Sequence, residues 1–340
     1  MSNKQLQRSG ADSTNIQAQT INFGPSYTEV RDIALDVFRN NFIRLSEEAY
    51  GEIRRRVEVF TDDFLRALHE RAPEAIENAR HPDMQRALFN AQQEYACSGD
   101  DELAGVLLDM LVDRASQTER SLRQLVLNEA LVTAPKLTNA EIMTLSLIFF
   151  MRRVKLNPSM ALTMENLRTS VTHFLAPLAG AATGDADMRH LEYAGCISIS
   201  MGEIGAASLY LQAYPGFFSK GVNVHSIRDE LLSAFAPYPD SESLYYVPVA
   251  DREMLQQYLE GIGMLEYENE INNLMSSNRM TSSEVLAFMG AEDAAVASLL
   301  ERWDTTSLKH AEISSVGLAI GHANLQRVTD FKTDLGVWIK

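Results

Sequence analysis

Three Ser/Thr-x-x-Glu capping boxes constrain the fold of this chain most strongly; they begin at Ser26, Thr138 and Thr281. In such a box the hydroxyl accepts a hydrogen bond from a backbone amide of the first helical turn, and the glutamate accepts one from the amide of the capping residue. Apolar residues spaced three or four apart follow each box, as at Val30 and Ile33. This spacing is the period of an amphipathic helix, so the sequence predicts a mainly α protein.

Residues 25–155 carry the clearest helical signals, and we expect them to form an N-terminal helical bundle. One long helix is predicted from apolar residues at Ala49, Ile53, Val57, Phe60, Phe64 and Leu68. Two further apolar stripes are supplied by Leu103, Leu107, Met110 and Leu111, and by Leu122, Leu125 and Val126. The most apolar stretch, residues 142–151, is 10 residues long, whereas a membrane span needs about 20. It is therefore expected to be a buried helix that closes the bundle.

Residues that start or end helices divide the chain further. Pro73 and Pro82 mark helix starts, because proline is tolerated in a first helical turn. Ser98-Gly99-Asp100 ends one helix and caps the next. The segment GCISIS at residues 195–200 is interpreted as a short strand or an extended loop. Three prolines within residues 237–250 make that stretch the best linker candidate.

The predicted organisation has four parts. Residues 1–24 form a flexible amide-rich segment and residues 25–155 the helical bundle. An irregular helical middle region follows at residues 156–249. Residues 250–340 combine helices with an apolar terminal segment (LGVWI, 335–339) interpreted as a strand. That order is the outline of a winged-helix-like α+β domain.

The charge of the chain argues against nucleic-acid binding. Among 340 residues there are 30 Lys and Arg against 46 Asp and Glu, a formal net charge of −16. Residues 250–340 alone hold 7 basic and 14 acidic residues, a net charge of −7. A DNA-reading domain needs Lys and Arg to contact the phosphate backbone. We therefore interpret the winged-helix-like unit as a protein-contacting or packing module.

The two cysteines, Cys97 and Cys196, lie 99 residues apart without a CxxC partner. This usage fits a reducing compartment rather than a disulfide framework. Residues 1–24 lack the apolar core of a secretion signal. We expect a cytoplasmic protein without a membrane span.

No motif in the sequence indicates a particular reaction. We predict no catalytic, cofactor-binding or metal-binding residues and no cofactor. Asp109 and Asp113 lie four apart on one helix face and have the spacing of paired metal ligands, but Arg114 and Arg120 nearby favour a solvated salt-bridged surface. His190, Glu192 and Cys196 resemble half of a zinc deaminase motif whose PCxxC part is missing. A Cys196–His190 nucleophile pair is the less favoured alternative to a buried cysteine. Arg54, Arg55 and Arg56 are interpreted as one solvated helix face.

The amide-rich segment NIQAQTINFG, residues 15–24, alternates its side chains between two faces. A short uncharged strand of this kind can stack with copies of itself, because amide ladders and backbone pairing reinforce each other. The alternative is a disordered terminal tail. The residues proposed for self-association are Ile16, Gln17, Gln19, Ile21, Asn22 and Phe23.

Several stretches resemble a bacterial family of uncharacterised proteins known by locus-tag names. They are INFGPSYTEVRDIALDVFRNNF (21–42), RALFNAQQEYACSGDDELAGVLLDMLVDR (86–114), PKLTNAEIMTLSLIF (135–149), SSVGLAIGHANLQRV (314–328) and LGVWI (335–339). In layout alone, a helical block followed by a C-terminal unit also resembles the Abi-alpha type of abortive-infection protein from phage defence. Residues 15–24 are similar to the short assembly motifs of bacterial immune proteins, although Ala18 stands where a glycine is usual.

Together these features favour a non-enzymatic protein that acts by self-assembly or by binding a protein partner. The resemblance in layout to Abi-alpha proteins implies a role in phage defence. A homo-oligomer is expected. Two alternatives stay open at this point. One is a metal-dependent effector enzyme, a hydrolase or nuclease using Asp109 and Asp113. The other is a winged-helix DNA-binding regulator.

Overall fold

The computed structural model describes residues 27–41, 47–156, 163–238 and 241–340. The described chain is mostly helical, so the predicted mainly α fold is confirmed. The residues proposed for self-association, Ile16, Gln17, Gln19, Ile21, Asn22 and Phe23, lie outside the described residues. Within the described part, none of the helices combines the length and apolarity that a bilayer crossing requires.

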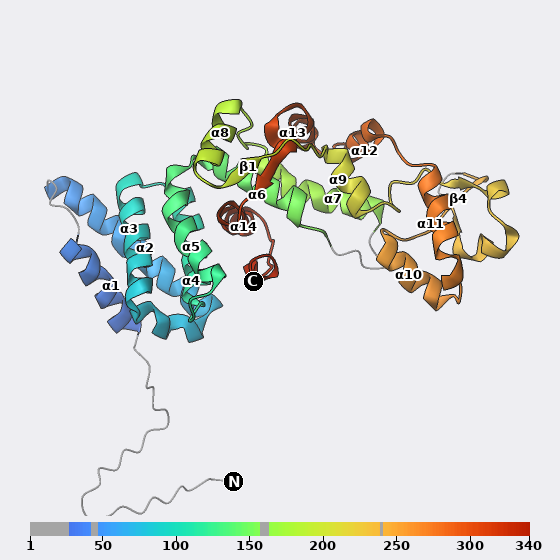
Figure 1. The fold of residues 1–340 in the computed structure, drawn as a ribbon. Coiled ribbons are helices and arrows are strands. Elements are labelled where there is room, and N and C mark those ends of the chain that lie inside the picture. Colours follow the sequence, from blue (N-terminus) through green and yellow to red (C-terminus); the bar gives the residue numbers. More distant parts are fainter. Residues whose placement is uncertain (1–26, 42–46, 157–162, 239–240) are drawn as a thin grey trace, which may run out of the picture.

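The first helices pack side by side at one end of the molecule (Figure 1). They are α1 (Tyr27–Asn41), α2 (Glu47–Arg71), η1 (Pro73–Arg80), α3 (Pro82–Ser98), α4 (Asp101–Ala115) and α5 (Leu122–Thr133). As predicted, Pro73 and Pro82 open their helices. Gly99 ends α3 in the left-handed region (φ 64°), and the Asp100 carboxylate accepts from the amides of Glu102 and Leu103 at the start of α4. The local signals therefore placed these helix ends correctly.

The middle of the molecule is built from two distant parts of the chain. Residues after α5 supply η2 (Ala134–Lys136), α6 (Asn139–Arg153), α7 (Met164–Leu175), η3 (Ala176–Leu178), α8 (Asp185–Tyr193), β1 (Ile197–Ile199) and α9 (Ala206–Ala213). Residues near the C-terminus supply α12 (Ser282–Met289), α13 (Ala294–Thr305), η7 (Ser307–His310), β5 (Ala311–Ile313), α14 (Ser315–Val328) and η8 (Leu335–Val337). The capping boxes at Thr138 and Thr281 form as predicted.

A third group of elements forms a lobe at the opposite end from α1 (Figure 1). It contains β2 (Val222–Asn223), η4 (Val224–Ser226), η5 (Asp229–Ala234), β3 (Ala236–Pro237), β4 (Leu244–Tyr246), α10 (Arg252–Gly261), η6 (Leu265–Tyr267) and α11 (Glu268–Ser277). Its antiparallel strand order is β2-β4-β3. The linker expected at residues 237–250 instead contains β4, and it buries Val247 and Val249 in the core of this lobe. Proline content alone did not reveal those buried contacts.

The expected winged-helix unit is not what residues 250–340 form. Their one strand, β5, pairs antiparallel with β1, with Ile313 opposite Ile197. The expected terminal strand is instead the 3-10 helix η8, and the Trp338 indole nitrogen donates to the Arg153 carbonyl (3.1 Å). The elements of this region thus pack against partners from elsewhere in the chain. The predicted boundaries at residues 155 and 250 stay predictions, although described contacts cross both of them.

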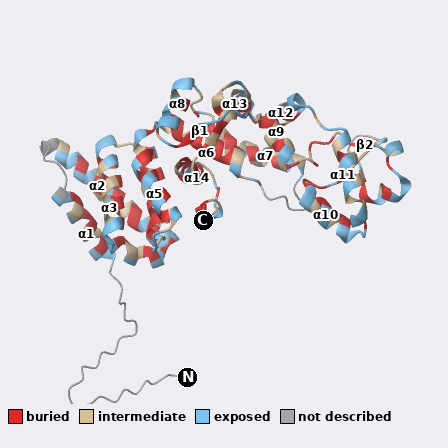
Figure 2. Ribbon diagram, viewed as in Figure 1, coloured by how far each residue is buried: buried red, intermediate tan, exposed pale blue. Residues whose placement is uncertain are grey.

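Helix α14 contacts both the N-terminal helices and the buried helix α6. It packs against α4, α5 and α6, so α14, together with α6, takes part in closing the bundle that the sequence predicted to be closed by the buried helix at residues 140–155. Buried residues continue from the bundle into α6 and α14 (Figure 2). The predicted burial of residues 142–151 is confirmed, since all but the half-buried Met143 are buried.

The α14–α6 contact is close enough to exclude a side chain. A Cβ on Gly321 would lie 2.6 Å from the Leu145 carbonyl oxygen and 2.7 Å from its carbonyl carbon. One turn further on, the Asn324 amide donates to the Ser146 hydroxyl (2.8 Å), and both residues are buried. A buried polar pair of this kind is costly to leave unmade, so it fixes the register of the two helices.

We expect Gly321→Ala to lower the free energy of unfolding by about 1–3 kcal/mol, because overpacking a tight contact displaces backbone. The measurement is urea unfolding followed by circular dichroism. Gly51→Ala is the matched control, since Gly51 is an exposed helical residue whose added Cβ would meet nothing within 4 Å. That variant should be as stable as the parent or more stable by up to about 1 kcal/mol. Equal effects of the two substitutions would contradict the proposed close contact.

Candidate functional site

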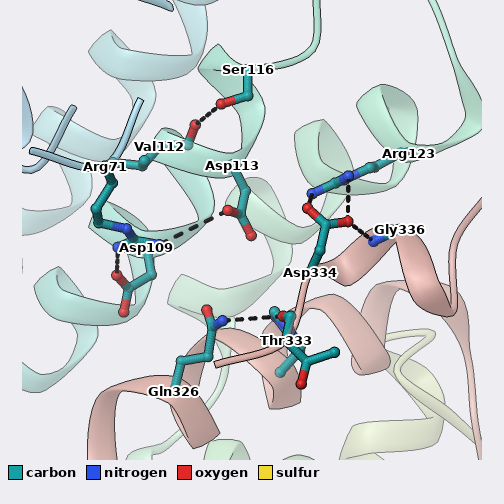
Figure 3. A network of polar contacts seen from close by, with 11 residues as sticks. Arg71, Asp109, Val112, Asp113, Ser116, Arg123, Gln326, Thr333, Asp334 and Gly336 are labelled. Atoms are coloured by element: carbon teal, nitrogen blue, oxygen red, sulfur yellow. Dashed lines mark hydrogen bonds and ion pairs between the residues drawn. The ribbon is translucent and has the colours of Figure 1, made fainter. Parts of the chain in front are cut away.

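A charged cleft of about 490 Å³ lies between the N-terminal helices and the segment that follows α14. Its lining comes from three separated parts of the chain: Arg71, Asp109, Asp113, Gln326 and residues 331–335. Figure 3 shows Arg71, Asp109 and Asp113 on one side, with Gln326, Thr333 and Asp334 opposite them. We call this site the Asp113 cleft.

Helix periodicity places the two aspartates in the cleft. Residues four apart lie on one helix face, and the opposite side of α4 is buried through Leu107, Met110 and Leu111. The opposite side of the cleft is formed by the C-terminal segment, which Asp334 fixes in place. The Asp334 carboxylate accepts from both terminal nitrogens of Arg123 (2.9 and 3.1 Å) and from the Gly336 amide (2.6 Å). This bidentate ion pair ties the C-terminal segment to α5.

Arg71, at the end of α2, is the cation that lies between the two aspartates (Figure 3). Its guanidinium is hydrogen-bonded to Asp109, and its other terminal nitrogen lies 3.9 Å from Asp113. The predicted partners Arg114 and Arg120 are wrong: Arg114 is buried and donates to Asp83 and Asn128, and Arg120 is exposed. The aspartate side chains are only 19% and 20% exposed. The pair is therefore half-buried rather than the solvated surface that the spacing suggested.

Burial dominates the electrostatics of the two aspartates. It raises the pKa of Asp113 from its ordinary value of 3.8 to about 6, against the opposing effect of Arg71 and Arg123. The pKa of Asp109 is also raised by burial, although Arg71 acts in the opposite direction. Removing a carboxylate from water disfavours its charged form. Asp113 is thus a carboxyl group whose charge is incompletely compensated within the described structure.

Two polar atoms beside the cleft have no hydrogen-bond partner among the described residues. The Thr333 carbonyl accepts from His322 Nε2 (2.7 Å) and from the Gln326 amide nitrogen (3.3 Å). Because a carbonyl only accepts, His322 carries its proton on Nε2, which leaves Nδ1 as a buried acceptor without a donor. The amide oxygen of Gln326 is likewise buried and unpartnered, and it points toward the side of the cleft that holds Asp109 and Asp113 (Figure 3).

The geometry does not support a metal-dependent enzyme at Asp109 and Asp113. In the part of the chain that the structure describes, no three His, Cys, Asp or Glu side chains gather closely enough to hold a metal ion. The space between the two carboxylates is taken by the guanidinium of Arg71. Sequence reasoning found the two aspartates from their spacing but missed Arg71, Gln326 and Asp334, which no local pattern connects to them.

The other sequence candidates are engaged in structural contacts. His190 Nδ1 is hydrogen-bonded to the buried Glu141 carboxylate (2.6 Å), and Glu192 accepts from the Ile199 amide. Burial raises the pKa of Cys196 to about 12, with a smaller contribution from Glu141, so its thiol stays protonated and is a poor nucleophile. Arg54, Arg55 and Arg56 pair with Glu58 and Glu52 along α2. Arg54 and Arg55 are exposed as the predicted solvated face requires, whereas Arg56 is half-buried and donates to the Ala96 carbonyl (3.0 Å).

A second surface feature lies on α5, where large apolar side chains are exposed. Leu122, Leu125 and Val132 are 56%, 44% and 43% exposed, whereas the sequence placed the two leucines in an apolar stripe with Val126. Of that stripe, only Val126 is buried. Beside them a groove of about 450 Å³ is lined by Asp83, Arg86, Ala87, Asn90, Leu125, Asn128, Glu129, Leu131 and Val132. We call this surface the α5 face.

One protein-family model, described only as ":-like" and naming no activity, matches residues 24–339. The chain therefore belongs to this uncharacterised family, as its sequence resemblance predicted. No curated protein and no solved structure matches the chain, and nothing in the comparisons supports the resemblance to Abi-alpha proteins. The match begins at residue 24, so nearly all of the amide-rich segment precedes it.

Because the pKa of Asp113 is raised in the native state, the free energy of unfolding should depend on pH through this residue. The native carboxyl binds a proton more readily than the unfolded one, so raising the pH from about 4 to about 6 costs native stability through this group. In Asp113→Asn that cost disappears. Relative to the parent, the variant should gain on the order of 2 kcal/mol in free energy of unfolding between pH 4 and pH 7, measured by urea titration at each pH.

Asp63→Asn is the control for this measurement, because it removes the same charge from an exposed ion pair with Arg66. Its difference from the parent should stay within about 1 kcal/mol at every pH. A difference between Asp113→Asn and the parent that does not change with pH would rule out an unusual titration of Asp113.

Proposed function

We propose that the protein acts without catalysis, through contact with other protein chains, and that a second copy of itself is its first partner. The observation that carries the proposal is the α5 face, where three large apolar side chains stay exposed although the fold offers a core for them. Exposed apolar residues that gather on one face mark contact surfaces more often than scattered ones do.

The apolar residues of the α5 face share one side of the helix. Leu122, Leu125 and Val132 lie three and seven residues apart, spacings that place their side chains on one side of a helix, with the charged Glu129 among them. Helix α5 meets the core with its other side, through Val126, Leu127 and Ala130. The exposed side is therefore free to meet a partner without disturbing the bundle.

The rim of the groove favours a second copy as the partner. It carries Arg86 together with the carboxylate of Glu129. In a two-fold symmetric dimer the same surface meets itself, so Arg86 of one copy faces the acidic side of the other. A polar rim around an apolar centre is also the usual anatomy of a protein interface.

Replacing two apolar residues of the α5 face should abolish this association. In Leu125→Glu/Val132→Glu each partner would bury two added charges, four in the dimer, and we expect the apparent mass to fall to that of the monomer, 37.9 kDa. Mass photometry and light scattering measure this directly. The matched control is Val59→Glu/Ile262→Glu, which adds the same charge at exposed apolar positions in α2 and directly after α10.

The control variant should associate like the parent. A parent that is monomeric at all concentrations, or a Leu125→Glu/Val132→Glu variant that associates normally, would overturn the role of the α5 face. Removing residues 1–24 in the same assay tests the separate prediction for Ile16, Gln17, Gln19, Ile21, Asn22 and Phe23. Loss of large assemblies with dimers retained would assign higher-order assembly to that segment.

The setting that we propose is phage defence by abortive infection; its support is the layout resemblance to Abi-alpha proteins and the likeness of residues 15–24 to immune assembly motifs. Bacteria that express the parent chain should then show reduced plating of at least one phage in a panel. Leu125→Glu/Val132→Glu should restore plating, whereas Val59→Glu/Ile262→Glu should not. Equal plating with and without the parent chain would contradict this setting.

A further inference from the structure

Helix α1 enters the bundle close to the α5 face. The Glu29 carboxylate in the first turn of α1 lies 3.9 Å from the Arg80 guanidinium at the end of η1. Further along, the ring centroids of Phe38 in α1 and Phe89 in α3 are 6.0 Å apart. Helix α1 therefore runs alongside α3 in the same direction, and the chain enters α1 beside the start of α3.

The groove of the α5 face begins at this same end of α3. Its lining includes Asp83 in the first turn of α3, followed by Arg86 and Asn90. Residue 24 precedes the start of α1 by three residues, a span of at most about 10 Å. Residues 16–23 cover roughly 26 Å when fully extended. They are therefore long enough, and attached closely enough, to lie along the groove of their own chain.

Residues 15–24 also have the composition that this groove requires. They carry no charge, so the acidic body of the chain does not repel them. Alternation along an extended segment places two amide and two apolar side chains on one side, namely Gln17, Gln19, Ile21 and Phe23. Such a side can cover an apolar surface and exchange hydrogen bonds with amide groups at the same time.

The groove presents the same two kinds of group. Leu125 and Val132 are apolar and exposed, and Asn90 and Asn128 are half-buried amides in its lining. The Asn90 side chain makes no hydrogen bond to another described residue. The Asn128 oxygen accepts from Arg114 (2.7 Å), which leaves its amide nitrogen as an unused donor among the described residues. These amides can pair with polar groups of a segment that covers Leu125 and Val132.

We propose that residues 16–23 occupy the α5 face of their own chain, with Ile21 and Phe23 against Leu125 and Val132, and that this contact regulates self-association. The inference rests on the proposed function, because it concerns control of the same surface. A segment tethered so closely meets its site at an effective concentration on the order of 1 mM. The contact hides both surfaces to which association is assigned, so two copies join only after the segment leaves.

The test measures binding of a labelled peptide of residues 14–24 to the full chain, by fluorescence anisotropy at concentrations where the protein is monomeric. Ile21→Asp/Phe23→Asp should bind the peptide about tenfold more tightly than the parent does, because its own segment no longer competes. The matched control is Ile16→Asp/Thr20→Asp, which adds the same charge on the opposite side of the segment. This control should bind the peptide as weakly as the parent, and Leu125→Glu/Val132→Glu should not bind it.

Mass photometry of the same variants tests the regulation. Ile21→Asp/Phe23→Asp should dimerise about tenfold more tightly than the parent, whereas Ile16→Asp/Thr20→Asp should dimerise like the parent. Equal peptide affinity of Ile21→Asp/Phe23→Asp and the parent would overturn the inference, as would normal peptide binding by Leu125→Glu/Val132→Glu with native circular dichroism. A peptide affinity of the parent that rises as the protein is diluted would assign the segment to a neighbouring copy, and would also overturn it.

Failure of the intramolecular contact and failure of the dimer give different results. Peptide binding as expected, with no dimer in the parent or in any variant, would refute association through the α5 face and retain the contact. A dimer that Leu125→Glu/Val132→Glu abolishes, together with no peptide binding by Ile21→Asp/Phe23→Asp, would refute the contact and retain the dimer.

Discussion

The backbone contact between α14 and α6 is the constraint on which the rest of the structure depends. Gly321 allows α14 to approach Leu145, and the Asn324–Ser146 hydrogen bond fixes the register of the two helices. With that register fixed, α14 also lies against α4 and α5. The segment after α14 then runs past the exposed side of α4, where Asp334 meets Arg123. The Asp113 cleft is a consequence of this arrangement.

Features set by short-range hydrogen bonds were predictable from the sequence. The boxes at Thr138 and Thr281, the proline starts at Pro73 and Pro82, and the stop at Gly99 depend on residues within one helical turn of each other. Such signals need no knowledge of the distant chain. The mainly α class follows from these signals, because each predicted helix shows apolar residues at helical spacing and a residue that marks where the helix begins or ends.

Features that depend on distant partners were not predictable. The stripe of Leu122, Leu125 and Val126 has helical spacing, but which side of α5 is buried is decided by α3, α4 and α14. The terminal LGVWI segment is apolar enough for a strand, yet its indole reaches Arg153, 185 residues earlier in the chain. The candidate site follows the same rule. Spacing placed Asp109 and Asp113 on one face, whereas their burial and their partners come from α2, α14 and the C-terminal segment.

The position of α14 in the chain has a consequence for synthesis. The helices α4, α5 and α6, against which α14 packs, leave the ribosome before it, and the Arg123–Asp334 pair closes a separation of 211 residues. Contacts so distant in sequence form slowly. Until α14 arrives, the apolar sides of α4, α5 and α6 stay open to other nascent chains. Efficient production of this protein should therefore depend on cellular chaperones that shield those surfaces during translation.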